Sequence, residues 1–166
     1  MLWHIAQMNV GRTIYPLDDP GMAEFVNQLD QVNALAEQSP GFVWRLKSDS
    51  GNATDIKTSD DPQFIVNMSV WQSPEALFDF VYKSAHRQVM VRRREWFEPP
   101  AGAYQVLWWV KAGRHPTPAR GLARLRHLDR HGPTPFAFTF RQKFPSRDVA
   151  GLPEDMRPEP YCVGWR

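Results

Sequence analysis

The chain has 166 residues, of which 42% are hydrophobic, so it is long enough to bury the core of one domain. Its net charge of +2 hides an asymmetry, because residues 1–83 carry 5 basic and 11 acidic side chains and residues 84–166 carry 15 and 7. The single cysteine, Cys162, excludes a disulfide within the chain, and no apolar run is long enough to span a bilayer. The first residues lack the basic and apolar regions of a signal peptide, so we expect a cytoplasmic protein with no membrane partner.

Hydrophobic periodicity divides the sequence into helices and strands without an interdomain linker. Strands are predicted over residues 2–10, 42–46, 63–71 and 104–111, with a last strand within 133–144. Helices are predicted over residues 22–38, 74–97 and 117–131. The polar residues 48–62 predict a surface loop.

The helix predicted over residues 74–97 carries the best candidate for a site residue. Ser73 is suited to cap its first turn, and Pro74 fits the first helical position, where its missing N–H costs nothing. Its apolar side chains fall in one arc that should pack on a sheet: Leu77, Phe78, Val81, Ala85, Val89 and Trp96. Tyr82 and His86 lie at the edge of this arc, where a side chain can line a cavity between helix and sheet.

The first six elements follow the order β-α-β-β-α-β, which is the order of the ferredoxin-like split βαβ fold. This order predicts an α+β domain with two helices on one face of a four-stranded antiparallel sheet, extended by a C-terminal helix and strand. Residues 1–147 are expected to form this single domain, and the proline-rich residues 148–166 an irregular tail. Because the strands carry large apolar side chains on both faces, the second face needs a cover. A second copy of the chain is the simplest cover, so we expect a homodimer that pairs through this sheet face.

Two histidines on the helix predicted over residues 117–131 raise the question of a metal site. His127 and His131 have the spacing of metal ligands, but the neighbouring arginines repel a cation and no third ligand is evident. We therefore expect no metal site.

The same helix carries an arginine row that could bind nucleic acid: Arg120, Arg124, Arg126 and Arg130. Asp129 interrupts the row and no nucleic-acid motif accompanies it, so a solvated helix face and no nucleic-acid partner are expected. Nucleotide-binding loops, the serine-hydrolase G-x-S-x-G motif and C-x-x-C pairs are also missing from the sequence.

Tryptophans and strand amides allow both a ligand-binding and a structural interpretation. Trp71 and Trp109 could stack on a flat ligand, although tryptophans more often fill a core. Trp108 and Trp109 are successive in a strand, so they point to opposite faces and at most one of them lines a given cavity. Asn67 and Ser69 indicate a polar patch on one sheet face, usable by a ligand or by buried water.

Several motifs resemble a known superfamily. The strand FIVNMSVW is followed by Trp71-Gln72-Ser73, Glu75-Ala76-Leu77, Phe80 and Ala85-His86-Arg87. This series resembles the dimeric α+β barrel superfamily, whose best-known members are the antibiotic-biosynthesis-monooxygenase-like proteins. The further pattern of RRREWF, VLWWV, the Arg-rich helix and the GPTPFAFTF segment is similar to an uncharacterised domain family within it, over residues 3–147.

The resemblance implies a small aromatic or apolar ligand between helix 74–97 and the sheet, with His86 as the catalytic base or ligand. Together with the helix positions and the tryptophans described above, it leads us to expect that the ligand-binding residues are Asn9, Trp71, Tyr82, Arg93 and Trp109. It requires no cofactor, because cofactor-free members bind small polyketide-like aromatics between helices and sheet. It leaves heme open as a cofactor, because in heme-degrading members a helical histidine and a first-strand asparagine fall where His86 and Asn9 fall. The tryptophan that those members carry upstream on the helix is replaced here by Ala76 and Leu77.

We therefore expect a small-molecule-binding protein with monooxygenase-like activity. The alternative hypothesis is a non-catalytic homodimeric binding or interaction protein with no open active site.

Overall fold

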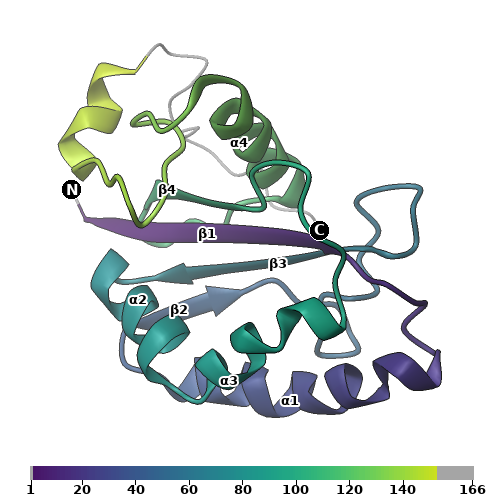
Figure 1. Ribbon diagram of the computed structural model, residues 1–166. Coiled ribbons are helices and arrows are strands. Elements are labelled where there is room, and N and C mark those ends of the chain that lie inside the picture. The colour runs from purple at the N-terminus through teal and green to yellow at the C-terminus, as the bar shows by residue number, and fades with distance from the viewer. Residues whose placement is uncertain (1, 153–166) are drawn as a thin grey trace.

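A four-stranded antiparallel sheet forms the centre of the computed structural model, which describes residues 2–152 (Figure 1). Its strands are β1 (Trp3–Arg12), β2 (Phe42–Arg45), β3 (Phe64–Trp71) and β4 (Gln105–Lys111). They lie in the order β2-β3-β1-β4, so the longest strand and its main partner occupy the middle. This is the ferredoxin-like order that the sequence predicts.

Helices cover both faces of the sheet. Helices α1 (Ala23–Gln38), α2 (Pro74–Lys83) and α3 (His86–Val91) lie on one face, and α4 (Pro118–His131) lies on the other (Figure 1). Short 3-10 helices occur at η1 (Pro20–Met22), η2 (Arg93–Glu95) and η3 (Ser146–Gly151). Two of the helices begin as predicted: Ser73 Oγ accepts a hydrogen bond from the Ala76 N–H at 3.1 Å, and Thr117 caps α4 in the same way.

The second sheet face is covered by α4 of the same chain. The prediction of a homodimer assumed that this face has no cover. Leu125 and Leu128 of α4 pack against Met8 and Met68, and all four side chains are buried. The helix approaches β1 most closely at Gly121, where a Cβ atom would lie 2.5 Å from Met8 Cε. The expectation that this face is bare and needs a second copy is therefore wrong.

The strand predicted within residues 133–144 does not form. Only Phe138 pairs with β4, through two backbone hydrogen bonds of 2.8 and 2.9 Å with Leu107, and residues 134–137 form a tight turn. Pro133 and Pro135 lack the N–H groups that a longer ladder needs. The alternating phenylalanines instead divide between the two sides of the sheet. Phe136 packs with the core residues around Leu125 of α4, and Phe138 packs with those around Leu77 of α2.

The long helix predicted over residues 74–97 is interrupted. Ser84 adopts an extended conformation with φ −99° and ψ 179°, its hydroxyl donates to the Phe80 carbonyl, and it accepts a hydrogen bond of 3.1 Å from the His86 N–H. A serine side chain can replace helical backbone bonds in this way. The chain therefore continues as the separate helices α3 and η2.

The predicted tail begins within an ordered segment. Residues 146–151 form η3, and Val149 is buried. Cys162 and the rest of the tail lie outside the described residues. Among the helices of residues 2–152, none combines the length and apolar character needed to cross a bilayer.

We expect Gly41→Ala to destabilise the fold more than Gly51→Ala. Both glycines have positive φ, at 81° and 86°, so each alanine pays a left-handed backbone cost of about 1–2 kcal/mol. At Gly41 the new Cβ would also lie 2.6 Å from Ala76 Cβ of α2, whereas nothing lies within 4 Å of it at Gly51. This clash adds about 1–3 kcal/mol. Urea unfolding of the two variants checks the difference, and equal midpoints would contradict the close packing of α2 on the end of β2.

Candidate functional site

A cavity lies between the sheet and the layer formed by α1, α3 and η2. Its volume is about 150 Å³, and an adjoining inner chamber of about 50 Å³ extends toward α2. The cavity and the chamber share lining residues from the sheet, α1 and α3: Asn9, Val32, Asn33, Arg45, Asn67, His86, Met90 and Gln105. His86 thus borders both spaces.

The floor of the cavity is a band of polar side chains that crosses the sheet. The strand register places Asn67, Asn9 and Gln105 side by side on β3, β1 and β4. Asn67 lies within a central strand and faces the helices, yet it is exposed. The helix layer therefore does not pack down on the sheet at this point.

A hydrogen-bonded network continues this polar floor into the inner chamber. Gln7 Nε2 donates to Asn67 Oδ1 at 2.8 Å and to Ser69 Oγ at 3.1 Å. Ser69 Oγ also accepts a 2.9 Å bond from the indole N–H of Trp71. The network holds these side chains in place between two apolar clusters of the same sheet face.

The roof of the cavity is α3, which has no buried residue although it lies over the sheet. The break at Ser84 causes this gap, because α2 packs down on the sheet through Leu77 and Val81 and α3 does not. Val89 and Met90 of α3 are half-buried and border the cavity.

His86 presents a free ring nitrogen. Its Nδ1 lies 3.3 Å from the carbonyl oxygen of Val81, and since a carbonyl can only accept, Nδ1 carries the proton and Nε2 the lone pair. The ring packs against Phe80, with 4.7 Å between centroids, and Phe80 stacks on Trp71 at 5.0 Å. Burial lowers the pKa of His86 below its usual value, so the neutral ring is favoured near pH 7.

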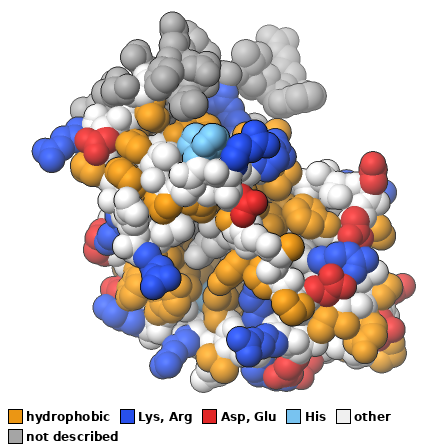
Figure 2. Space-filling view, turned by 45° about the horizontal axis from the view of Figure 1, so that its top comes forward, with side chains coloured by type: hydrophobic (Ala, Val, Ile, Leu, Met, Phe, Trp, Pro, Cys, Tyr) orange, Lys and Arg blue, Asp and Glu red, His pale blue; other side chains and the backbone are white. Residues whose placement is uncertain are grey.

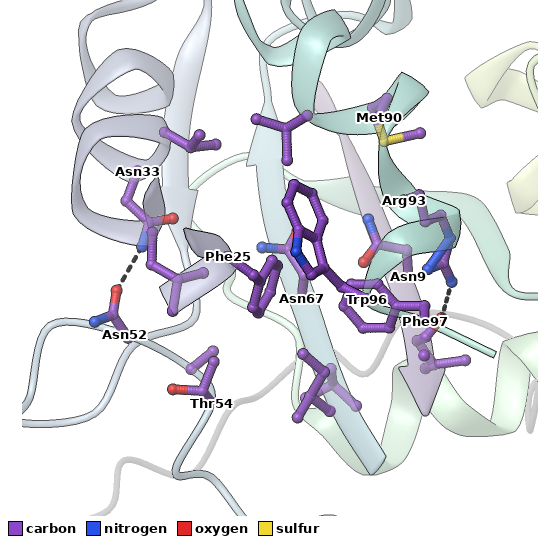
Figure 3. Close-up of a pocket in the computed structure, with 18 of the residues that line it drawn as sticks. Asn9, Phe25, Asn33, Asn52, Thr54, Asn67, Met90, Arg93, Trp96 and Phe97 are labelled. Atoms are coloured by element: carbon purple, nitrogen blue, oxygen red, sulfur yellow. Dashed lines mark hydrogen bonds between the residues drawn. The ribbon is translucent and has the colours of Figure 1, made fainter. Parts of the chain in front are cut away.

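Aromatic rings close the outer end of the cavity. Phe25 of α1 lies 5.7 Å from Trp96 and 5.2 Å from Phe97 between ring centroids. Figure 3 shows these rings above the strands that carry Asn9 and Asn67. The outer cavity therefore combines aromatic walls with an amide floor.

Arginine supplies the positive charge of the cavity. The guanidinium of Arg93 donates to the Val10 carbonyl at 3.0 Å and lies over the ring of Phe97 (Figure 3). It also lies over the ring of Tyr104, 5.0 Å from the ring centroid. Burial lowers the pKa of Arg93. Arg45, whose Nε is 2.8 Å from Glu37 Oε1, is the other cationic lining residue, and no carboxylate lines the cavity among the described residues.

The structure brings four of the predicted site residues together. Asn9, Arg93 and His86 line the outer cavity, and Trp71 and His86 line the inner chamber. Trp108 and Trp109 pack on opposite sides of the sheet, as their succession in a strand predicts.

Tyr82 and Trp109 do not line the cavity or the chamber, which corrects their predicted place. Tyr82 is exposed and contacts Phe78 and Phe140, because helical spacing places it beside Phe78, away from the buried Leu77 and Val81. Trp109 packs with Phe138 and donates a 2.7 Å hydrogen bond to the Phe144 carbonyl. The segment after α4 thus covers the end of β4 that carries Trp109.

Sequence reasoning did not identify several polar lining residues: Gln7, Asn33, Arg45 and Gln105. A signal for Gln7 was present, because strand alternation puts it on the same face as Asn9, opposite Asn67 and Ser69. Several polar side chains together on a sheet face that is covered by helices indicate the floor of a cavity. Arg45 and Asn33 gave no comparable pattern.

The arginine row of α4 is only partly solvated, which corrects the expected solvated face. Arg124 is 7% exposed and lies over Phe136 at 4.4 Å and Trp108 at 5.4 Å. Burial lowers the pKa of Arg124 to about 10. On the face shown in Figure 2, basic side chains are scattered among acidic and hydrophobic ones and form no continuous basic surface.

His127 and His131 lie next to each other, with ring centroids 4.6 Å apart. His127 Nε2 is 3.1 Å from Thr134 Oγ1, which gives it a structural partner. Within residues 2–152, no three His, Cys, Asp or Glu side chains are grouped closely enough to hold a metal ion.

The space around His86 is small compared with a heme macrocycle. A cavity of about 150 Å³ is the size that accepts a single benzene ring, whereas a heme macrocycle contains four pyrrole rings. The ring of Phe80, tilted by 37° with 4.7 Å between centroids, also packs against the imidazole of His86.

The fold and the cavity together define a ferredoxin-like α+β domain with a ligand-sized space between its sheet and one helix layer. The chain belongs to the family described as a domain of unknown function (DUF3291), whose model matches residues 4–152. The predicted membership of an uncharacterised domain family is thereby confirmed. No curated protein matches the sequence.

The chain is also similar, at low sequence identity, to several solved structures. SnoaB, a cofactor-independent oxygenase from Streptomyces nogalater, is 17% identical with a TM-score of 0.43, covering 69% of this chain and 97% of SnoaB. A monooxygenase from the gene ActVA-Orf6 of Streptomyces coelicolor, in complex with nanaomycin D, is 15% identical with a TM-score of 0.39, covering 70% of this chain and 93% of its own. The fold of this chain is defined by its own strand order and register.

We expect His86 to titrate below its usual pKa of about 6.5, because burial disfavours the imidazolium. An NMR titration of the imidazole C–H signals, assigned with His86→Gln, measures this pKa. As the pH falls, the His86 imidazole of the unfolded chain is protonated before that of the folded chain. The free energy of unfolding therefore decreases between about pH 6.5 and the pKa of the folded state, and it should decrease less in His86→Gln. A midpoint at or above the usual value would contradict the burial of the ring.

Hemin should give no His86-dependent spectral change, because the cavity is too small for the macrocycle. Absorbance titration of the wild-type chain and of His86→Ala tests this expectation. A Soret shift that appears in the wild-type chain and is lost in the variant would show that the cavity opens to admit heme.

Proposed function

We propose that the chain binds a small aromatic or apolar molecule in the cavity between the sheet and helices α1 and α3. The observation that supports this proposal best is the space itself: about 150 Å³ lined by Phe25, Trp96 and Phe97 on one side and by amides on the other. An apolar cavity of this volume accepts a single aromatic ring. The polar floor gives such a ring a preferred orientation.

We extend this proposal to the monooxygenase-like activity that the resemblance implies, in which His86 acts as the general base. Its Nε2 carries a lone pair, its Nδ1 is held by the Val81 carbonyl, and it borders both the cavity and the chamber. A neutral imidazole in this arrangement can take a proton from an O–H or an activated C–H of a bound molecule. Arg93 would stabilise the anion that forms, because no carboxylate lines the cavity among residues 2–152.

The alternative hypothesis is a non-catalytic homodimeric interaction protein with no open active site. It requires an interior filled by side chains and a free sheet face for the second copy. The cavity beside His86 and the position of α4 over the second sheet face both count against it.

We expect toluene to raise the thermal unfolding temperature of the wild-type chain, because a ligand that binds only the folded state stabilises it. Val32→Trp should abolish this shift, since Val32 lines both the cavity and the chamber and the larger ring fills the space. Val26→Trp is the matched control, because Val26 is exposed on the same helix and should leave the shift unchanged. An equal shift in all three proteins would show that toluene binds elsewhere.

A further inference from the structure

We propose that Gln7 makes the inner chamber a subsite for a hydrogen-bond donor group of the ligand, a hydroxyl or an N–H carried on a small aromatic ring. This inference rests on the proposed function and names the chemical class of molecule that the site takes. Gln7 lies on the central strand β1 and lines the chamber beside His86.

The side chain of Gln7 has one polar atom without a partner. Gln7 is 4% exposed, and both protons of its amide nitrogen are used, by Asn67 Oδ1 and Ser69 Oγ. Its Oε1 is buried and accepts no hydrogen bond. Leaving a buried acceptor unpaired is costly, so a donor from outside the protein is favoured there.

The surrounding network holds the Gln7 amide in an orientation that leaves Oε1 without a partner among the described residues. Swinging Oε1 elsewhere would break both bonds of Nε2, and Ser69 is itself held by the indole N–H of Trp71. Gln7 also sits between its neighbours on both sides of β1, opposite Ser69 and Leu107. The acceptor is therefore fixed in advance of binding, which lowers the entropy cost of recognition.

The sizes of the two spaces decide which part of the ligand reaches Gln7. The chamber of about 50 Å³ takes a group the size of a hydroxyl, whereas the outer cavity of about 150 Å³ takes the ring. Because Arg45 and Arg93 are the charged lining residues and no carboxylate among the described residues lines either space, a neutral donor is favoured over an ammonium group. A donor at this position also lies on the side of the site that His86 borders.

Four one-ring probes test the proposal by isothermal titration calorimetry: p-cresol and p-toluidine, which carry a donor, and 4-methylanisole and toluene, which do not. We expect the two donors to bind the wild-type chain about five- to tenfold more tightly than the other two, the effect of one added hydrogen bond. Gln7→Met keeps the side-chain length and should remove this preference, so that the variant binds all four probes with similar affinity. Gln72→Met is the matched control, because Gln72 is exposed outside the cavity and its change should keep the preference.

Equal affinities of p-cresol and 4-methylanisole for the wild-type chain would overturn the subsite, and would show that Oε1 holds only a buried water. A preference that survives in Gln7→Met would overturn it too. In both cases toluene binding would leave the proposed function intact, whereas failure of all four probes to bind would remove both. If Gln7→Met does not fold, the wild-type comparison decides, together with the NMR shift of the Gln7 side-chain amide, which p-cresol should change and toluene should not.

Discussion

The cavity depends on the hydrogen bonds that Ser84 makes at the end of α2. Its hydroxyl binds the Phe80 carbonyl and receives the His86 N–H, so the backbone leaves the helix for one residue before α3 begins. A continuous helix would carry its apolar stripe along the whole sheet and bury the amides of β1 and β3, which is unfavourable without partners. The helix layer is therefore interrupted at the place where the sheet carries polar side chains that would be costly to bury.

The protein completes its own core without a second chain. The helix and the irregular segment that follow β4 bury the face of the sheet that a minimal βαββαβ unit leaves open. The cavity beside His86 lies on the first face, whereas on the second face α4 approaches β1 closely enough to contact Met8 at Gly121. The face under α4 therefore contributes to stability, and the face under α1 and α3 forms the floor of the candidate site.

Sequence patterns predicted the elements whose periodicity is strong and whose ends carry capping residues. The strand order followed from element order, and the cap at Ser73 and the position of His86 beside a cavity were predicted correctly. The break at Ser84 was not predictable from the apolar arc, because a serine within a helix pattern is compatible with either outcome. The cover provided by α4 was also missed, since its narrow leucine stripe contains Arg124, and only the structure shows this side chain buried over two aromatic rings.

The short contact between Phe138 and Leu107 has a consequence for how the molecule behaves at high concentration. It occupies the outer hydrogen-bonding edge of β4 with a non-strand segment, while β2, the opposite edge, has only four residues and a bulge in its pairing. Exposed sheet edges are the places where strands of other molecules add and fibrils grow. With its own backbone bonded to the middle of one edge and only four residues in the other, the sheet offers the strands of other molecules a short edge to add to.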